Sequence, residues 1–272
     1  MLAVQKNYYN DIDNIVCFPG NNIVCFPGNN EPWNYKSTRM ECLYNDEEVN
    51  RLNEIFVRHI QIANTYKRRK KAIRDLTMYQ CSINIGLRGG DFCNLRWFSI
   101  YDEEWNIKNH EDFIPQKTTK RNDNGEIIKR KYVRLIYNDN FKGAIERWRQ
   151  FLIDNGEDID IRDYIFLGTN KNSIKEKTWY DKVEEYRKEA GIEQKIGTHG
   201  LRKTFGRRYY MAAENKWDAL IQLQRIFRHS SPEVTLLYIC VTDQEIYDNI
   251  KKICIEENHG DFGFVNYDGG DK

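Results

Sequence analysis

Residues 198–238, which decide the fold, read THGLRKTFGRRYYMAAENKWDALIQLQRIFRHSSPEVTLLY. Apolar residues recur in this stretch at helical spacing, and the pattern predicts helices over about 200–213, 215–227 and 231–239. The last helix has a favourable start, because the letters SSPE supply a serine cap and a proline in the first turn. Helical patterns therefore dominate the C-terminal half of the chain.

The preceding part of the chain is predicted to form further helices and one pair of strands. Asn45 or Asp46 can cap a first helix that has acidic residues in its first turn. Expected strands over 107–117 and 131–137 flank the letters NDNG, a strong hairpin-loop signal. We therefore predict a mainly α fold with a small antiparallel β-sheet. The other expected helices cover residues 67–85, 141–153, 173–189 and 243–254.

Only one domain is clearly indicated, and we place it at residues 45–254. Residues 1–44 contain the octapeptide NIVCFPGN twice, at 14–21 and 22–29. Solenoid repeats need longer units and several copies, so we expect an irregular arm in which the duplication has no structural role. Residues 255–272 are acidic and rich in glycine, which predicts a flexible tail.

The composition is that of a globular protein, with 40% hydrophobic and 31% charged residues among 272. The net charge is +1, but the charges are unevenly distributed along the chain. Residues 1–50 hold three basic and seven acidic residues, and residues 256–272 hold one basic and five acidic residues. The body between them therefore carries +9, which permits a nucleic acid as partner.

Several classes of protein are disfavoured. No apolar run is long enough to span a membrane, and the N-terminus lacks the apolar region of a secretory signal, so we expect a cytoplasmic protein that is not associated with membranes. Seven cysteines without a C-x-x-C pair argue against a disulfide framework and a zinc site. No glycine-rich phosphate loop follows a strand, so nucleotide-binding folds have no support.

Four separated segments carry polar residues that suggest a common site. Each has an ordinary explanation on its own: a local ion pair of Arg88 with Asp91, a solvated strand lysine, a core histidine or a buried tyrosine. Their joint occurrence favours shared chemistry. The segments are GLRGGD at 86–91, QKTTK at 116–120, THGLRKTF at 198–205 and FRHSSPEVTLLY at 227–238.

This arrangement resembles the active-site boxes of the tyrosine recombinases, also called the phage integrase family. GLRGGD resembles the arginine box, the hairpin resembles the strand pair that presents the family's lysine, and HGLR matches the H-x-L-R box. HSS, followed by a tyrosine nine residues after its histidine, matches the last box. The resemblance covers about residues 45–254 and implies the tyrosine recombinase catalytic-domain fold. The matching residues are Arg88, Lys117, His199, Arg202, His229 and Tyr238.

The resemblance implies a site-specific DNA recombinase that cleaves and rejoins strands through a covalent 3′-phosphotyrosyl intermediate. Tyr238 would be the nucleophile, and since a tyrosine hydroxyl has a pKa near 10 it needs a proton acceptor, for which His199 is the candidate. Lys117 would protonate the departing 5′-hydroxyl. Such a protein would serve integration, excision or inversion of a mobile DNA segment.

The phosphate would be held by cationic side chains. Arg88 and Arg202 can fork onto the non-bridging oxygens, and His229 can donate a further hydrogen bond. His199 and Arg202 are three residues apart, so a helix puts both on one face. Because the arginines neutralise the charge and the phosphotyrosyl bond conserves energy, the resemblance implies neither a metal nor another cofactor.

The sequence departs from the family pattern in three places. Asp91 stands where the family usually has glutamate, and Arg228 stands where a glycine usually precedes the last histidine. Many members also have a separate helical DNA-clamping domain, whereas residues 1–44 are too short and too rich in turn residues to form one. We therefore expect a compact enzyme consisting of the catalytic domain.

The expected partners follow from the same resemblance. They are a double-stranded recombination site, further copies of the chain forming a tetramer in synapsis, and accessory DNA-binding proteins. DNA contacts would go largely to the phosphate backbone, from Lys120, Arg121 and Lys203 among others.

Two other functions fit the sequence. A DNA-binding regulator or a decayed recombinase would bind DNA without strand exchange, and the absence of a clamping domain is the reason to keep this alternative. A type IB topoisomerase-like enzyme would nick and reseal DNA with similar chemistry. The small size and the HSS box favour the recombinase.

Overall fold

The computed structural model describes residues 40–115, 132–168 and 170–241 in full, together with Asn124 and the backbone of 15–17, 23–25, 120–121 and 127–129. The chain forms two compact units, Met1–Thr38 and Arg39–Lys272. The predicted helix at 243–254 and the predicted tail lie outside the described residues.

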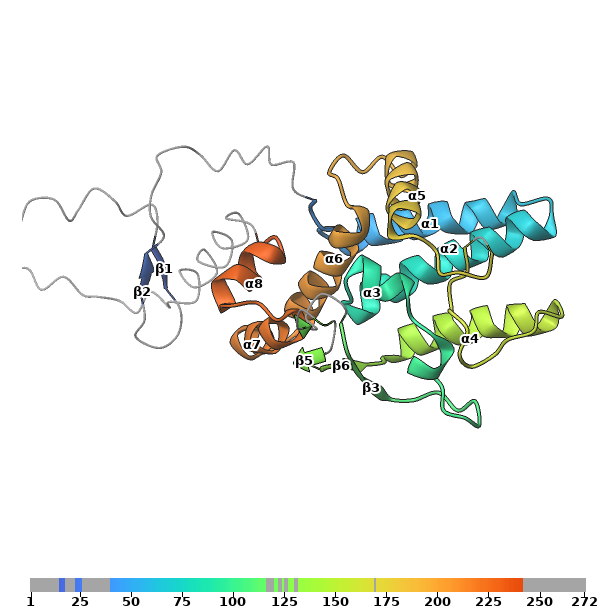
Figure 1. Ribbon diagram of the computed structural model, residues 1–272. Coiled ribbons are helices and arrows are strands. Elements are labelled where there is room, and N and C mark those ends of the chain that lie inside the picture. Colours follow the sequence, from blue (N-terminus) through green and yellow to red (C-terminus); the bar gives the residue numbers. More distant parts are fainter. Residues whose placement is uncertain are drawn as a thin grey trace, which may run out of the picture. The chain divides into compact units, whose positions relative to one another are not determined.

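The described helices are α1 (Asp46–Gln61), α2 (Tyr66–Ile85), α3 (Gly89–Cys93), α4 (Asp139–Asp154), α5 (Glu176–Glu189), α6 (Gly197–Ala212), α7 (Lys216–Phe227) and α8 (Pro232–Tyr238), with a 3₁₀ turn at Trp97–Ser99 (Figure 1).

Among the described residues, the strands of the second unit form two antiparallel pairs. β3 (His110–Phe113) pairs with β6 (Val133–Ile136), and β4 (Lys120–Arg121) pairs with β5 (Ile127–Lys129). Along β6 buried and exposed residues alternate, so one face of the β3–β6 pair covers the core. The predicted mainly helical fold with a small antiparallel sheet is confirmed, although β3 and β6 are shorter than the predicted strands.

Local side-chain contacts explain where several helices begin and end. Asn45 caps α1 by accepting a hydrogen bond from the backbone N–H of Glu48 at 2.9 Å, and Ser231 caps α8 by accepting one from Val234 at 3.4 Å. α2 ends at Gly86, whose φ of 65° is left-handed and favours glycine. This turn reverses the chain and brings Arg88 to the start of α3.

The main hydrophobic core lies among the helices before α6. α2 lies between α1 and α4 (Figure 1). At its centre the Phe56 ring stacks on Tyr79 with centroids 4.9 Å apart and meets the edge of Tyr186 at 4.7 Å. Burial of such large rings stabilises this core.

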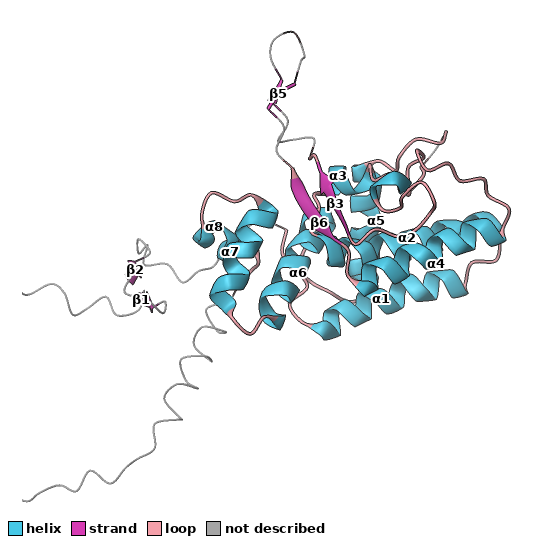
Figure 2. Cartoon of the chain, turned by 90° about the horizontal axis from the view of Figure 1, so that it is seen from below, coloured by secondary structure: helices cyan, strands magenta, loops and turns pink. Residues whose placement is uncertain are grey.

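A second, smaller cluster lies on the other side of α6, where α7 and α8 pack (Figure 2). Its fully buried members are Leu223, Phe227 and Ile239, and Tyr238 packs against them. α6 is therefore the element shared by the two clusters.

Gly206 allows α6 to approach this second cluster closely. A Cβ atom at Gly206 would lie 2.6 Å from Cε2 of Phe227 and 2.8 Å from Cγ2 of Ile239. We expect Gly206→Ala to lower the free energy of unfolding by about 1–3 kcal/mol, because both neighbours must move. Urea denaturation measures the change.

Gly143 provides the matched control in α4. A Cβ atom there meets only the flexible end of Arg147, at 3.2 Å. Gly143→Ala should therefore raise the free energy of unfolding by about 0.5–1 kcal/mol through helix propensity. A destabilisation of equal size in both variants would contradict the close-approach explanation.

The first unit corrects one expectation. β1 (Ile15–Cys17) and β2 (Ile23–Cys25) come from the two copies of the octapeptide and pair as antiparallel strands, with Val16 opposite Val24. The prediction that the duplication has no structural role was therefore wrong for these residues. Each copy supplies two β-branched residues, which favour a strand, and turn-forming residues lie between them in the sequence.

Candidate active site

Arg202, on α6, is the buried cation at the centre of the site. Its side chain donates to the backbone oxygen of Gly86 and, from Nη2 at 3.3 Å, to that of Phe227. Its Cζ atom lies 4.6 Å from the centroid of the Phe227 ring. Burial lowers the pKa of Arg202 and the charge of Arg88 lowers it further, while the negative charge of Asp91 opposes both. Arg202 thus joins the ends of α2 and α7.

Arg88 immediately precedes α3 and has an extended backbone, with φ −69° and ψ 149°. Its positive charge lowers the pKa values of Arg202, His229 and Tyr238. Since such effects fall off with distance, the three groups lie around one cationic centre. The two arginines repel each other, which makes the site suited to an anion.

Tyr238, the last residue of α8, lies beside this centre, because its ring and the Arg202 guanidinium both pack against the Phe227 ring. The ring meets those of Phe227 and His229 edge-on, with centroids 5.1 Å and 4.7 Å away. Burial raises the pKa of Tyr238, and the charges of the two arginines oppose this rise. The hydroxyl is therefore protonated at neutral pH and needs a proton acceptor to act as a nucleophile.

His229 is held beside Tyr238 by two contacts. Its backbone N–H donates to Gln224 at 3.1 Å, and its Nδ1 is hydrogen-bonded to the hydroxyl of Thr235, also at 3.1 Å. Burial, together with the charges of Arg202 and Arg88, lowers the pKa of His229 to about 4. The imidazole is thus neutral at pH 7.

The lowered pKa of His229 predicts a pH dependence of stability. In the unfolded chain this histidine has a pKa near 6.5. Between about pH 6.5 and 4 it is therefore protonated in the unfolded chain but neutral in the folded one, and the free energy of unfolding decreases as the pH is lowered through this range. We expect His229 to contribute about 1–2 kcal/mol to this loss, reduced by solvent screening of a half-exposed group.

Urea denaturation at about pH 6.5 and about pH 4.5 measures this contribution. His229→Gln should show a smaller loss than the wild type, whereas His110→Gln, on an exposed strand residue, should show the same loss. Identical pH dependence in the wild type and His229→Gln would disprove the assignment.

The structure brings together four of the six side chains that the sequence indicated, namely Arg88, Arg202, His229 and Tyr238. His199 lies on α6 one turn before Arg202 with an exposed side chain. Lys117 lies outside the described residues. The catalytic role of each of the six stays a prediction.

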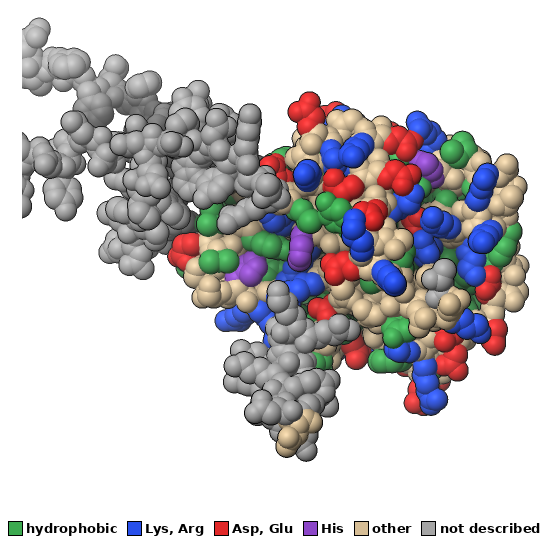
Figure 3. All heavy atoms as spheres, turned by 45° about the horizontal axis from the view of Figure 1, so that its top comes forward, with side chains coloured by type: hydrophobic (Ala, Val, Ile, Leu, Met, Phe, Trp, Pro, Cys, Tyr) green, Lys and Arg blue, Asp and Glu red, His purple; other side chains and the backbone are tan. Residues whose placement is uncertain are grey.

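The predicted DNA contacts have different surroundings. Nζ of Lys203 lies 5.3 Å from the centroid of the Tyr238 ring and 3.8 Å from Sγ of Cys240, so this half-buried lysine is a neighbour of the tyrosine. Lys120 and Arg121 form β4, and their side chains lie outside the described residues. On the face drawn in Figure 3, Lys and Arg side chains are spread among Asp and Glu and form no single patch.

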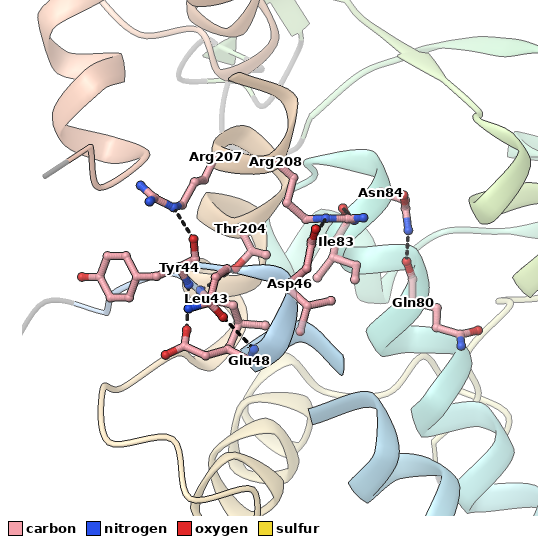
Figure 4. Close-up of polar contacts among 12 residues, drawn as sticks. Leu43, Tyr44, Asp46, Glu48, Gln80, Ile83, Asn84, Thr204, Arg207 and Arg208 are labelled. Carbon is pink, nitrogen blue, oxygen red and sulfur yellow. Dashed lines mark hydrogen bonds and ion pairs between the residues drawn. The ribbon is translucent and has the colours of Figure 1, made fainter. Parts of the chain in front are cut away.

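Residues 40–44, at the end of the predicted arm, pack against α6. The backbone N–H of Leu43 donates to the hydroxyl of Thr204 at 2.9 Å, and buried Arg207 donates to the backbone oxygen of Tyr44 at 2.8 Å (Figure 4). Arg207 also donates to the backbone oxygen of Cys240 at 2.8 Å. This segment therefore helps to hold the chain that follows Tyr238.

Two residues of the site were not indicated by the sequence. Phe227 contacts the side chains of Arg202, His229 and Tyr238, yet a phenylalanine at the end of an apolar helix carries no distinguishing signal. Thr235 is fully buried and binds His229. Its position one helical turn before Tyr238 was the available signal, because side chains three apart share a helix face.

The described residues contain no group of three or more His, Cys, Asp or Glu side chains that could hold a metal ion. In the same part of the chain, Cys42, Cys81, Cys93 and Cys240 are unpaired thiols. No helix of this part is long and apolar enough to cross a membrane.

Comparison with known proteins agrees with this geometry. A family model described as the phage integrase family matches residues 48–245. The probable integrase/recombinase YoeC of Bacillus subtilis strain 168 is 32% identical over 105 residues, which are 36% of this chain and 52% of that protein. The chain thus spans about half the length of this curated relative.

Solved structures share the fold. XerA recombinase matches with a TM-score of 0.55 and 18% identity, over 81% of this chain and 66% of that chain. XerH recombinase in a post-cleavage complex with its palindromic difH substrate matches with a TM-score of 0.56 and 16% identity, over 79% and 54%. The Tn1549 transposon integrase bound to circular intermediate DNA has a TM-score of 0.50 and 19% identity, over 80% and 68%. The likeness establishes a tyrosine recombinase catalytic-domain fold, and the match of the family model to most of the chain shows that it belongs to the phage integrase family.

Proposed function

We propose that this protein is a site-specific DNA recombinase that cleaves and rejoins strands through a 3′-phosphotyrosyl intermediate, in the integration, excision or inversion of a mobile DNA segment. The observation that carries the proposal is that Arg202, His229 and Tyr238 of one chain pack around the Phe227 ring, where the charge of Arg88 acts on all three. Membership of the phage integrase family supports it.

In the proposed cleavage step the Tyr238 oxygen attacks the scissile phosphorus. An O–P bond to the tyrosine forms and the bond from phosphorus to the 5′-oxygen breaks, so the number of phosphate ester bonds is unchanged. The tyrosine proton passes to His199, which lies one turn from Arg202 on α6. The leaving 5′-oxygen takes a proton from Lys117. Rejoining is the reverse attack by a 5′-hydroxyl.

The cationic centre would stabilise the transition state of this step. Arg88 and Arg202 bind the non-bridging oxygens, whose negative charge grows as the fifth bond to phosphorus forms. His229, neutral in the free protein, contributes a hydrogen bond. Each such interaction typically supplies a few kcal/mol of the barrier reduction.

The proposed partner is a double-stranded recombination site. The XerH and Tn1549 integrase structures contain those proteins bound to DNA, and the body of this chain carries a net charge of +9 between residues 51 and 255. We further propose that residues 45–254 are the catalytic domain, that four copies assemble in synapsis, that accessory DNA-binding proteins assist, and that the protein acts in the cytoplasm at the nucleoid.

Trapping the covalent intermediate tests the proposal. The full chain is incubated with a pool of nicked duplexes of random sequence, in which the short strand beyond the cleaved bond diffuses away and prevents rejoining. We expect a protein–DNA adduct that survives denaturation, with the DNA attached through its 3′-phosphate to the peptide that contains Tyr238. Sequencing the attached DNA then yields the preferred site.

The same assay separates the alternatives. Enrichment of one sequence, followed by strand exchange between two duplexes that carry it, supports the recombinase. Relaxation of arbitrary supercoiled plasmid without strand exchange would instead identify a topoisomerase-like enzyme. Sequence-specific binding with no adduct would identify a regulator or a decayed recombinase.

A further inference from the structure

We propose that Arg228 binds the DNA backbone at the scissile phosphate as a third arginine of the site, in addition to Arg88 and Arg202. This inference rests on the proposed function and extends it. Arg228 occupies the position where the family usually has glycine, so the sequence has replaced a residue without a side chain by a cation.

The backbone at Arg228 is one that glycine adopts most easily. Arg228 ends α7 in the left-handed region, with φ 59° and ψ 45°. A residue with a side chain is disfavoured there, and glycine is the common choice at this position after a helix. An arginine in this place therefore indicates that its side chain contributes something that outweighs the conformational cost.

The electrostatic surroundings place the Arg228 side chain at the cationic centre. Burial lowers its pKa, and the charge of Arg88 lowers it further. Arg88 acts in the same way on Arg202. The charge of Arg88 thus acts on two other arginines in a partly buried region, and a phosphate bound there would relieve the repulsion.

A hydrogen bond fixes the direction of the Arg228 side chain. Its Nη2 donates to the backbone oxygen of Tyr132, the residue immediately before β6. Because a guanidinium has five N–H donors in one plane, this contact can hold the group without ending its capacity to bind phosphate. The next residue, His229, contacts the Tyr238 ring. The cation is thus anchored to the backbone just before β6, and it is next in sequence to a residue that contacts the tyrosine.

The neighbouring cations serve as comparison. Arg225, three residues earlier in the last turn of α7, is exposed. Lys203 lies against the Tyr238 ring and Cys240. Arg228, by comparison, donates to the backbone oxygen of Tyr132, and the charge of Arg88 lowers its pKa.

The experiment compares Arg228→Gly, Arg228→Lys and the control Arg225→Ala in the full-length protein. The DNA is the sequence recovered from adducts of the wild type. Single-turnover cleavage is measured at saturating DNA on the nicked duplex. The salt dependence of binding is measured on the intact duplex with Tyr238→Phe added to each variant, so that no cleavage interferes.

We expect Arg228→Gly to melt at the wild-type temperature or above, because glycine suits the backbone, and yet to cleave about tenfold or more slowly. Its slope of log K against log salt should fall by about 0.9, the value for one phosphate contact. Arg228→Lys should keep the slope, and Arg225→Ala should keep the cleavage rate.

Wild-type values of both slope and cleavage rate in Arg228→Gly would overturn the inference. Slower cleavage with an unchanged slope would also overturn it, since Arg228 would then act only on the protein structure. If the wild type forms no adduct, the proposed function fails, and the slopes measured on a duplex of random sequence decide on Arg228 separately.

Discussion

Tyr238→Phe is expected to abolish covalent attachment to DNA while leaving the fold and DNA binding nearly unchanged. Removal of a nucleophile typically lowers the rate by about 10⁴-fold or more, because the remaining groups have no covalent step to assist. The phenylalanine ring keeps the contacts with Phe227 and His229. The free energy of unfolding should change by about 1 kcal/mol or less, the net contribution of one hydrogen bond.

Tyr209→Phe is the matched control, because Tyr209 packs against the same small cluster while its hydroxyl donates to Gln222. This variant should form the adduct at the wild-type rate. Gel electrophoresis under denaturing conditions, with labelled nicked DNA, measures both. An adduct in Tyr238→Phe, or its loss in Tyr209→Phe, would mean that the nucleophile lies elsewhere in the chain.

Features that depend on local sequence were predicted well. The Asn45 cap, the buried stripe of Val49, Leu52 and Phe56 on α1, and the serine cap of α8 follow from side chains near one another in the sequence. Helix periodicity and caps act over about one or two turns, so they can be read without knowledge of the tertiary fold. The pairing of β3 with β6 was also predicted locally, from the hairpin signal NDNG that lies between the two strands in the sequence.

The parts that were not predicted depend on contacts between distant segments or on backbone atoms. Gly89 and Gly90 begin the short helix α3, where Glu176 and Thr198 lie against the space that a side chain at Gly89 would fill. Arg202 donates to two backbone oxygens, and a backbone oxygen has no signature in the sequence. The packing of residues 40–44 on α6 depends on Thr204 and Arg207 in the same way.

In the candidate site, too, some features were predicted from the sequence and others depend on the fold. The four clustered residues were found because their spacing matches a family pattern, whereas the place of Lys203 against the Tyr238 ring could not be read from a run of basic residues. Arg228 was visible in the sequence as a departure from the family pattern, but the effect of the Arg88 charge on its pKa depends on the fold. The family pattern in the sequence thus identifies the candidate residues, and the fold determines which of their charged groups lie close together.

The two apolar clusters suggest how the site is held together. Tyr238 belongs to the small cluster with Phe227 and Ile239, which has far less buried area than the main core. Small clusters contribute little to resisting local opening. Arg202 bonds to Gly86, next to the main core, and to Phe227 in the small cluster, so it links the two by polar contacts.

Arg202→Lys is therefore expected to impair both stability and cleavage, although the charge is conserved. A single ammonium on a flexible chain cannot reproduce the planar fork that donates to Gly86 and Phe227 together, and buried acceptors left unpaired cost about 2–3 kcal/mol of unfolding free energy. Loss of the fork at the phosphate should slow cleavage by about 10²–10³-fold, measured at a low temperature at which the variant is still folded. Arg208→Lys, on the same helix with a long 3.5 Å contact to Ile83, should change the free energy of unfolding by about 0.5 kcal/mol or less and leave cleavage unchanged. Equal stability and cleavage in Arg202→Lys and Arg208→Lys would show that charge alone suffices at this position, since the fork is the one property that the first substitution removes from the site.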